Sequence, residues 1–305
     1  MLATTTFPTS APCVVVSALI PGHLYLLHKE IFQDALESGV ETGAIVPTFS
    51  FLIEHSTKGK SLFDFGLRKP ECEKDVSDIL TENNVDPYEI QGIIFSSLVN
   101  KRCFMHSHLH FDHIGDVQIC PSAEIILASE AESLFEKPTY PTDHVSPFNE
   151  WPEGRCELYQ IQRKSLLLID APGHFLGHLA ALSRVGLAPM DIEGSTTAKL
   201  DRKHNSSNYS ETCSIRQISE ENHEDIGVSR ATMASLIRVA EDLPNIVIIL
   251  AHEKDYEGEG MPIVPAPLNG WAMDRVRRRT HVLNQSISEQ SRVCAGLFSY
   301  FSFTK

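Results

Sequence analysis

One short segment of the chain carries most of the residues that could perform chemistry. Residues 105–116 read MHSHLHFDHIGD and contain His106, His108, His110, Asp112 and His113. Several imidazoles packed beside a carboxylate repel one another when protonated, and they are costly to desolvate unless a cation organises them. Imidazole and carboxylate ligands without thiolate suit Zn²⁺, with Mn²⁺ or Fe²⁺ as alternatives. The segment therefore predicts a divalent metal site, against the alternative of a solvated histidine-rich loop.

The spacing divides these side chains into two sets. In an extended segment His108 and His110 point the same way, so both can bind one ion. Asp112 and His113 lie beyond the bend and can bind a second ion nearby. The sequence thus predicts two ions per chain, with Zn²⁺ as the first expectation.

Neither set is complete, so further ligands must come from other parts of the chain. His174 lies in APGHFLGH, which follows the apolar run LLLID, and His252 follows the apolar run NIVIIL. Both histidines are predicted to be ligands. We expect His178 to support or pack behind a ligand. The remaining histidines, among them His28 and His223, are expected in surface or loop positions.

The elements that must position these residues are short apolar strands with helices between and after them. Strands are predicted over 13–20, 48–55, 61–65, 90–95, 123–127, 156–161, 165–169, 179–185 and 245–250. The turn at 58–60 makes a hairpin of two of these strands. Apolar residues recur at helical spacing over 73–84 and 229–243. This pattern favours an α/β fold with two sheets and helices outside them.

The composition excludes several classes of partner. The chain has 305 residues, 42% of them hydrophobic, and a formal net charge of −14. Nucleic acid is bound by clustered Lys and Arg, and no dense basic stripe is present, so no nucleic acid partner is expected. No apolar run approaches the roughly 18 residues that cross a bilayer, and residues 1–12 lack the pattern of a signal peptide. We therefore expect a cytoplasmic protein without a membrane partner.

Three motifs resemble one known superfamily. HLHFDH at 108–113 matches the H-x-H-x-D-H signature of the metallo-β-lactamase superfamily, and Pro172-Gly173-His174 and the strand-terminal His252 stand at the later places of that pattern. The flanking sequences SHLHFDHIGD, TFSFLIEH with SLFDFGLRK, and LAHE are similar to the lactonase-type branch, which includes acyl-homoserine lactonases and fungal homologues. The resemblance covers roughly residues 13–185 and 228–260. It implies an αββα sandwich of two mixed sheets, with the metals at one sheet edge, in a single domain over 1–305.

The chain departs from this pattern in two places. Residues 97–107 separate the apolar run IIFS from His108, and this stretch is interpreted as either a gene-model error or a genuine insertion. Residues 186–227 are polar without periodicity and are interpreted as a long loop or an insertion. The family also supplies an Asp that bridges the two ions. Asp191 is our preferred candidate and Asp201 the other, but neither follows a clear apolar strand. Without a bridging carboxylate, the second ion would bind weakly.

The resemblance implies a hydrolase, in which a metal-bound hydroxide attacks an acyl carbon while an ion polarises its carbonyl oxygen. Asp112 is the expected catalytic residue, because it would orient the hydroxide and deliver a proton to the leaving group. The chain has no G-x-S-x-G elbow for a serine nucleophile. The expected partner is a small-molecule lactone or lactam, such as a xenobiotic or a secondary metabolite. The alternatives are a thioester hydrolase of the hydroxyacylglutathione hydrolase type and a catalytically impaired homologue that lacks the bridging Asp.

Overall fold

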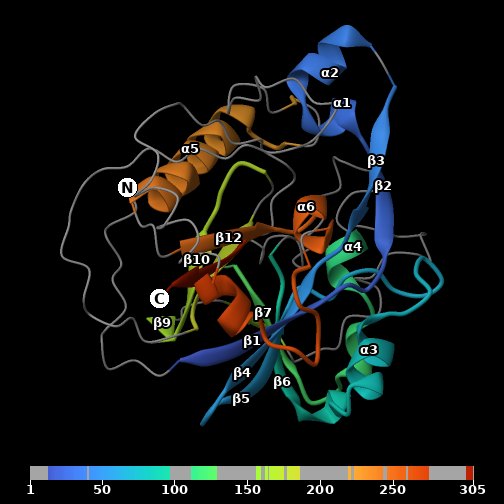
Figure 1. Ribbon diagram of the computed structural model, residues 1–305, viewed down its shortest axis with the longest axis vertical. Helices are drawn as coiled ribbons and strands as arrows, with labels where there is room; N and C mark the ends of the chain where they lie inside the picture. Colours follow the sequence, from blue (N-terminus) through green and yellow to red (C-terminus); the bar gives the residue numbers. More distant parts are fainter. Residues whose placement is uncertain are drawn as a thin grey trace.

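The first of two large β-sheets is built mainly from the N-terminal half of the chain (Figure 1). Its strand order is β1 (Val14–Leu19), β4 (Ser50–His55), β5 (Gly59–Phe63), β6 (Ile90–Ile94), β7 (Glu124–Leu127) and β8 (Cys156–Leu158). The strands from β1 to β5 are antiparallel, and those from β5 to β8 are parallel. The sheet is therefore mixed, and the predicted hairpin is confirmed as β4 and β5.

The computed structural model describes residues 13–39, 41–96, 111–128, 156–158, 162–163, 165–174, 177–185, 219–220, 223–242, 246–258, 260–274 and 300–304. The candidate residues His108, His110, Asp191 and Asp201 lie outside these ranges. So do the insertion-like stretch 97–107 and most of the stretch 186–227.

The second sheet is also mixed. Its order is β12 (Ile246–Leu250), β13 (Tyr300–Thr304), β11 (Leu179–Arg184), β10 (Leu166–Asp170) and β9 (Gln162–Arg163). β13 pairs in parallel with β11 and antiparallel with β12. The apolar segment near the C-terminus is thus an inner strand of this sheet.

The main core lies between the two sheets. Alternate residues of β1, namely Val14, Val16 and Ala18, are buried in one cluster with Ala181 of β11 and Ile249 of β12. Side chains alternate between the two faces of a strand, so the other face of the first sheet is free to pack against helices. The two sheets therefore bury their inner faces against each other, as the predicted sandwich requires.

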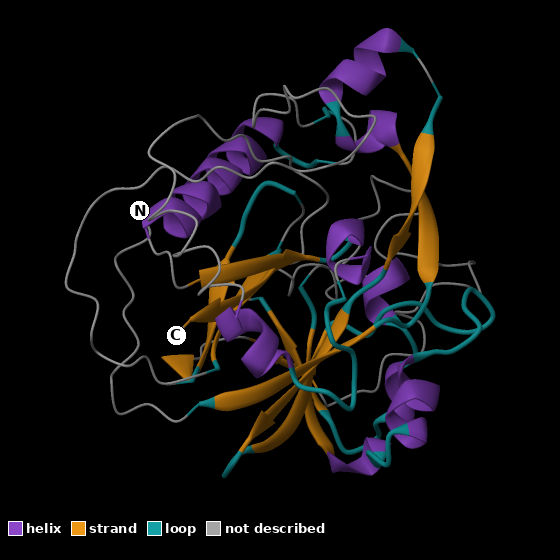
Figure 2. Cartoon of the chain, viewed as in Figure 1, coloured by secondary structure: helices purple, strands orange, loops and turns teal. Residues whose placement is uncertain are grey.

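Helices cover the outer faces of both sheets (Figure 2). Val76 and Leu80 of α3 (Val76–Glu82) pack with Ile93 of β6 outside the first sheet. Met233 of α5 (Ile226–Asp242) packs with Ala180 of β11 outside the second. The αββα architecture is confirmed.

The helix predicted over 229–243 begins earlier, at Ile226. The reason is the preceding Asp225, whose Oδ1 accepts a hydrogen bond from the backbone N–H of Val228 at 2.9 Å. An Asp at this position satisfies one of the unpaired donors of the first turn and so sets where the helix begins. The last two residues of the stretch 186–227 therefore belong to α5.

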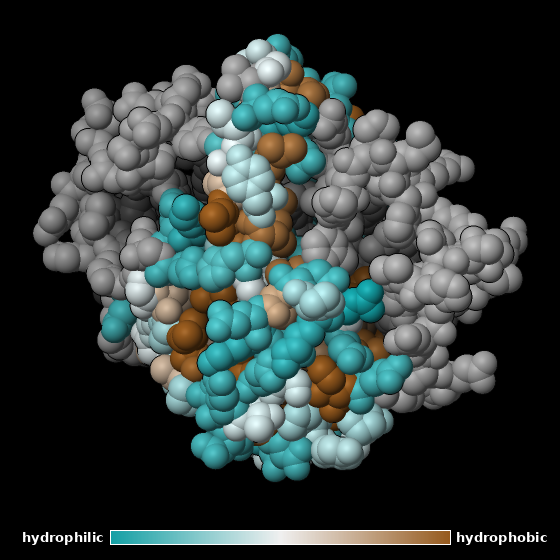
Figure 3. Space-filling view, turned by 90° about the vertical axis from the view of Figure 1, so that its right-hand side faces the viewer, coloured by the Kyte–Doolittle hydropathy of each residue, from teal (hydrophilic) through white to brown (hydrophobic). Residues whose placement is uncertain are grey.

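A ribbon that sequence analysis did not predict extends from the sandwich. It consists of the antiparallel strands β2 (His23–Leu27) and β3 (Gly43–Pro47), joined through α1 (His28–Ile31) and α2 (Gln33–Ser38). Figure 3 shows this side of the molecule, where hydrophobic residues form small patches among hydrophilic ones. Tyr25 and Ile45 are cross-strand partners on the ribbon, and each is 59% exposed.

The remaining short helices lie in the connections. They are η1 (Pro87–Glu89), α4 (Phe111–Ile114), η3 (Val117–Ile119) and α6 (Lys254–Gly258), with a further helical turn over 268–274. α4 carries two of the predicted ligands, and α6 follows His252 directly. Within the described ranges, none of the helices combines the length and apolar character needed to traverse a bilayer.

Candidate metal site

Three of the predicted ligands meet at one place. Asp112 and His113 lie on α4, and His252 follows β12, yet one ligand atom from each lies within 4.8 Å of the other two. Asp112 Oδ2 lies 3.0 Å from His252 Nε2 and 3.3 Å from His113 Nε2. Asp112 and His113 are buried. The structure thus brings His252 together with Asp112 and His113. The spacing along the chain did not show which of the two sets of ligands His252 would join.

The other ring nitrogen of each histidine is already engaged. His113 Nδ1 lies 2.9 Å from Asp64 Oδ2, and His252 Nδ1 lies 3.0 Å from the carbonyl oxygen of Pro47. Carboxylate and carbonyl oxygens only accept hydrogen bonds, so both Nδ1 atoms carry a proton and donate it. In a neutral imidazole, the lone pair is then on Nε2. Both Nε2 atoms face the Asp112 carboxylate, and each carries a lone pair when its ring is neutral.

This arrangement fits a divalent cation. Two lone pairs and a carboxylate oxygen at about 3 Å repel one another unless positive charge lies among them. The charge is supplied either by protons on the Nε2 atoms or by a metal ion. Imidazole nitrogen and carboxylate oxygen are suitable ligands for Zn²⁺ and related ions. Hydrogen bonds from the Nδ1 atoms also orient ligating histidines in known metal sites.

The negative charges of Asp112 and Asp64 also favour a positive charge on the His113 ring. Burial by itself would lower the pKa of His113, but the carboxylates of Asp112 and Asp64 outweigh burial and raise this pKa to about 9. In the metal-free chain, the His113 ring therefore carries a second proton, on Nε2, at neutral pH. A metal ion that binds Nε2 must displace this proton.

Asp64 is a site residue that sequence analysis missed. It follows β5, is 1% exposed, and accepts hydrogen bonds from Ser96 N–H and Ser96 Oγ, both at 2.8 Å, in addition to His113. Its φ of 59° lies in the left-handed region, which few residues other than Gly, Asn and Asp tolerate. The available signal was an acidic residue within the apolar segment SLFDF.

His252 is positioned by the base of the β2–β3 ribbon. Pro47, the last residue of β3, accepts the His252 hydrogen bond, and Phe49 N–H donates to the carbonyl oxygen of Ala251 at 3.1 Å. At the other end of α6, Glu257 pairs with His23 of β2 at 2.9 Å. The ribbon therefore holds the segment that carries this ligand.

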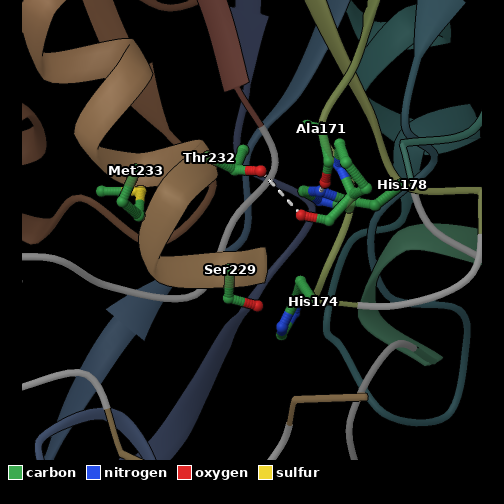
Figure 4. A pocket seen from close by; sticks show the side chains of 7 residues that line it. Ala171, His174, His178, Ser229, Thr232 and Met233 are labelled. Carbon is green, nitrogen blue, oxygen red and sulfur yellow. Dashed lines mark hydrogen bonds between the residues drawn. The ribbon is translucent and has the colours of Figure 1, made fainter. Parts of the chain in front are cut away.

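His174 lies in a neighbouring group of side chains (Figure 4). The loop from Ala171 to His178 closes on itself, because Ala171 N–H donates to the His178 carbonyl at 2.9 Å and His178 Nδ1 bonds to the Ala171 carbonyl at 3.0 Å. The rings of His174 and His178 are 5.3 Å apart. Among the residues with described coordinates, His174 is not part of the group within 4.8 Å that Asp112, His113 and His252 form.

Gly173 allows this loop to approach α5. Its φ is +109°, and a Cβ atom at this position would lie 2.2 Å from the backbone nitrogen of Ser229. Thr232 Oγ1 also donates to the Pro172 carbonyl at 2.8 Å, which Figure 4 marks with a dashed line. The small pocket between loop and helix is lined by Ala171, Pro172, His174, His178, Ser229, Thr232 and Met233.

His28 differs from its predicted surface or loop position, whereas His223 lies in a loop as predicted but contacts another candidate residue. His28 is 8% exposed, and its Nδ1 bonds to Thr42 Oγ1 at 2.8 Å. His223 lies against His174, with the two Nδ1 atoms 3.1 Å apart. Burial, followed by the charge of Arg230, lowers the pKa of His223 to about 4. No local pattern marked the contact of His223 with His174, because the two residues are 49 positions apart in the chain.

His178 has the supporting and packing role that the sequence suggested. It is 1% exposed and bonds to Ala171 within its own loop. Burial lowers the pKa of His178 to about 4, against the hydrogen bond to Ala171 and with a contribution from His113. His178 is therefore neutral at pH 7.

No protein-family model matches the chain. "Gamma-lactamase FDB1" of Fusarium pseudograminearum is 28% identical over 210 residues, which cover 55% of this chain and 48% of that protein. "Metallo-hydrolase mfmC" of Annulohypoxylon moriforme is 28% identical over 206 residues, which cover 58% of this chain and 54% of that protein. "Cytochrome P450 monooxygenase mpaDE" of Penicillium roqueforti is 23% identical, covering 87% of this chain and 36% of that protein. The chain thus spans about half the length of these curated relatives, or less.

The fold is shared with solved structures. An N-acyl homoserine lactone hydrolase, with the product N-hexanoyl-L-homoserine bound at its catalytic metal centre, superposes with a TM-score of 0.52. The sequence identity is 16%, and the match covers 84% of this chain and 99% of that chain. The chain is thus similar in sequence to proteins named for γ-lactamase and metallo-hydrolase activity, and it shares its fold with an N-acyl homoserine lactone hydrolase.

Proposed function

We propose that the chain is a metal-dependent hydrolase that opens the ring of a small-molecule lactone or lactam. The observation that carries the proposal is the meeting of Asp112, His113 and His252, with two imidazole lone pairs directed at one carboxylate. The relatives named for γ-lactam and lactone hydrolysis support the choice of substrate class.

We assign the metal ligands in two groups. Asp112, His113 and His252 would hold one ion, supported by their distances. His108, His110 and His174 would hold the other, and Asp191 would bridge the two, which rests on the sequence pattern. The donor types favour Zn²⁺. The small-molecule partner, the single domain over 1–305 and a cytoplasmic location remain proposals of the same kind.

When bound, a divalent ion at such a site supplies an activated water and polarises an acyl oxygen. We assign Asp112 the role of acting on that water, since its Oδ2 lies 3.0 Å from His252 Nε2 and 3.3 Å from His113 Nε2. It can accept a proton from the water and pass it to the leaving oxygen or nitrogen of the opened ring. Asp64 and Pro47 keep the imidazoles of His113 and His252 oriented during this transfer.

Two alternatives differ in what they predict. A thioester hydrolase would use the same residues on an acyclic activated acyl group. An impaired homologue without a bridging carboxylate would bind metal weakly and turn over neither class. The curated relatives named for lactam hydrolysis favour the cyclic substrate.

The test combines metal content with a substrate panel. The purified full chain is analysed for Zn²⁺, Mn²⁺ and Fe²⁺, and is then incubated with an N-acyl homoserine lactone, a γ-lactone, a γ-lactam and S-lactoylglutathione. We expect ring opening that a chelator abolishes and Zn²⁺ restores. Turnover of the thioester alone would favour the first alternative, and weakly held metal without turnover of any substrate would favour the second.

Asp112→Asn provides the matched variant for this assay. It removes a ligand charge, so we expect loss of bound metal and at least about a hundredfold loss of turnover, since even residues that only orient ligands change metal affinity or activity by 10–100-fold. Asp34→Asn is the control, because Asp34 is exposed on α2. Equal metal content and turnover in both variants would contradict the assignment of Asp112.

A further inference from the structure

Within the described part of the chain, His223 faces His174. The proposed function assigns no role to His223. The two Nδ1 atoms are 3.1 Å apart, and the ring centroids are 4.8 Å apart with the planes at 61°. The same His223 Nδ1 atom also lies 3.0 Å from Ser229 Oγ. His174 is 3% exposed and Ser229 is 2% exposed, so these contacts are shielded from solvent.

Backbone hydrogen bonds hold the two histidines in this relation. Glu224 N–H donates to the His174 carbonyl, and Asp225 N–H donates to the Gly173 carbonyl, both at 2.9 Å. The residues that directly follow His223 are thus paired with the loop that carries His174. These backbone hydrogen bonds fix the distance between the two segments, so the contact between the rings is determined by the fold as well as by the side-chain rotamers.

The contact decides which nitrogen of His174 is available to a metal. Two nitrogen atoms that face each other at hydrogen-bond distance share one proton, so one ring donates and the other accepts. If the proton is on His174 Nδ1, the lone pair of His174 is on Nε2 and can bind an ion. If the proton is on His223 Nδ1, His174 carries its own proton on Nε2 and offers that atom no lone pair.

We infer that His223 is a positioning residue, which accepts a hydrogen bond from His174 Nδ1 and thereby keeps the lone pair of His174 on Nε2, the atom that would bind a divalent ion. Ser229 Oγ lies beside the same nitrogen of His223, 3.0 Å away. This inference rests on the proposed function, because it requires His174 to be a ligand. Orienting partners of this kind change metal affinity by about 10–100-fold when they are removed.

Two substitutions separate the hydrogen bond from the packing. His223→Asn keeps an acceptor near the position of Nδ1, whereas His223→Leu has a similar size and keeps none. The Zn²⁺ affinity and stoichiometry of each full-length variant are measured by competition with a chelator, and urea unfolding checks that each variant is folded. His55→Leu serves as a control for the loss of a histidine whose side chain bonds to Thr57 near a turn.

We expect His223→Leu to bind Zn²⁺ about 10–100-fold more weakly than the unmodified chain, and His223→Asn and His55→Leu to bind it nearly as tightly as that chain. Imidazole ¹⁵N NMR of the Zn²⁺-loaded protein should show a proton on His174 Nδ1 and no coordination of His223. Unchanged affinity in a folded His223→Leu variant, equal weakening in His223→Asn, or coordinated His223 would overturn the inference. If the unmodified chain binds no Zn²⁺, the proposed function itself fails.

Discussion

His113 Nδ1 donates a hydrogen bond to Asp64 Oδ2 at 2.9 Å, and this bond joins α4 to the end of β5. The backbone repeats the connection, since Phe65 N–H donates to the His113 carbonyl at 2.7 Å. One buried carboxylate thus orients a histidine of the proposed metal site and also receives the two hydrogen bonds from Ser96, which follows β6. Asp64 therefore links the stability of the first sheet to the geometry of the site.

Asp64→Asn tests this link. Asparagine tolerates the positive φ, but its single carbonyl oxygen cannot replace both carboxylate oxygens, so at least one donor among Ser96 and His113 is left unpaired. We expect the free energy of unfolding to fall by roughly 1–3 kcal/mol, as measured by urea denaturation. Zn²⁺ affinity should fall as well. A variant as stable as Asp34→Asn would show that Asp64 is dispensable.

Gly173→Ala tests the close approach of the His174 loop to α5. The added methyl would meet Ser229 N at 2.2 Å in a backbone conformation with φ of +109°. We expect a loss of roughly 2–4 kcal/mol in unfolding free energy, together with weaker metal binding. Gly39→Ala is the matched control, because Gly39 also has positive φ, at +65°, and a methyl added there would meet no neighbouring side chain or backbone within 4 Å. If both variants lose the same stability, backbone strain alone explains the effect.

Acid stability should depend on the two neutral histidines. The pKa values of His178 and His223 are lowered to about 4, whereas an unfolded histidine titrates near 6.5. Below pH 6.5 the unfolded chain therefore binds more protons, and the free energy of unfolding should decrease as the pH falls towards 4. Each residue contributes on the order of 1–3 kcal/mol.

His178→Asn is the variant for this pH series. Its side-chain amide can donate to the Ala171 carbonyl in place of His178 Nδ1, but it does not titrate. Urea unfolding between pH 4 and pH 7 should give a flatter profile for this variant. The same slope in both proteins would mean that His178 is not responsible for the acid sensitivity.

Metal binding should release a proton from His113. The pKa of about 9 keeps this ring protonated at pH 7.5 in the metal-free chain. Because the folded pKa lies above the unfolded value, this contribution to stability is complete below about pH 6.5 and is lost as the pH rises through about 9. Titration calorimetry with Zn²⁺, in two buffers of different ionisation enthalpy, should show release of about one proton at pH 7.5. Binding without proton release would contradict the placement of the ion on His113 Nε2.

The ligand types and the layered fold could be predicted because they depend on local patterns. Alternating or continuous apolar runs marked β1, β6 and β12, and the motif around Asp112 and His113 indicated metal chemistry. The predicted start of α5, at residue 229, was too late by three residues. The helix begins after Asp225, which bonds to the first turn but is not part of the repeat of apolar residues. The β2–β3 ribbon was missed because its strands lack a clear alternating pattern, with exposed apolar residues such as Tyr25 and Ile45.

By itself, the sequence determined which side chains can bind a cation and which segments form strands, since residue type and periodicity are properties of the chain read in order. Only the tertiary structure decided which of them meet. His252 joins Asp112 and His113, Asp64 orients His113, and His223 faces His174, through contacts between residues far apart along the chain. Such contacts follow from how sheets, loops and helices pack, and no local pattern encodes them.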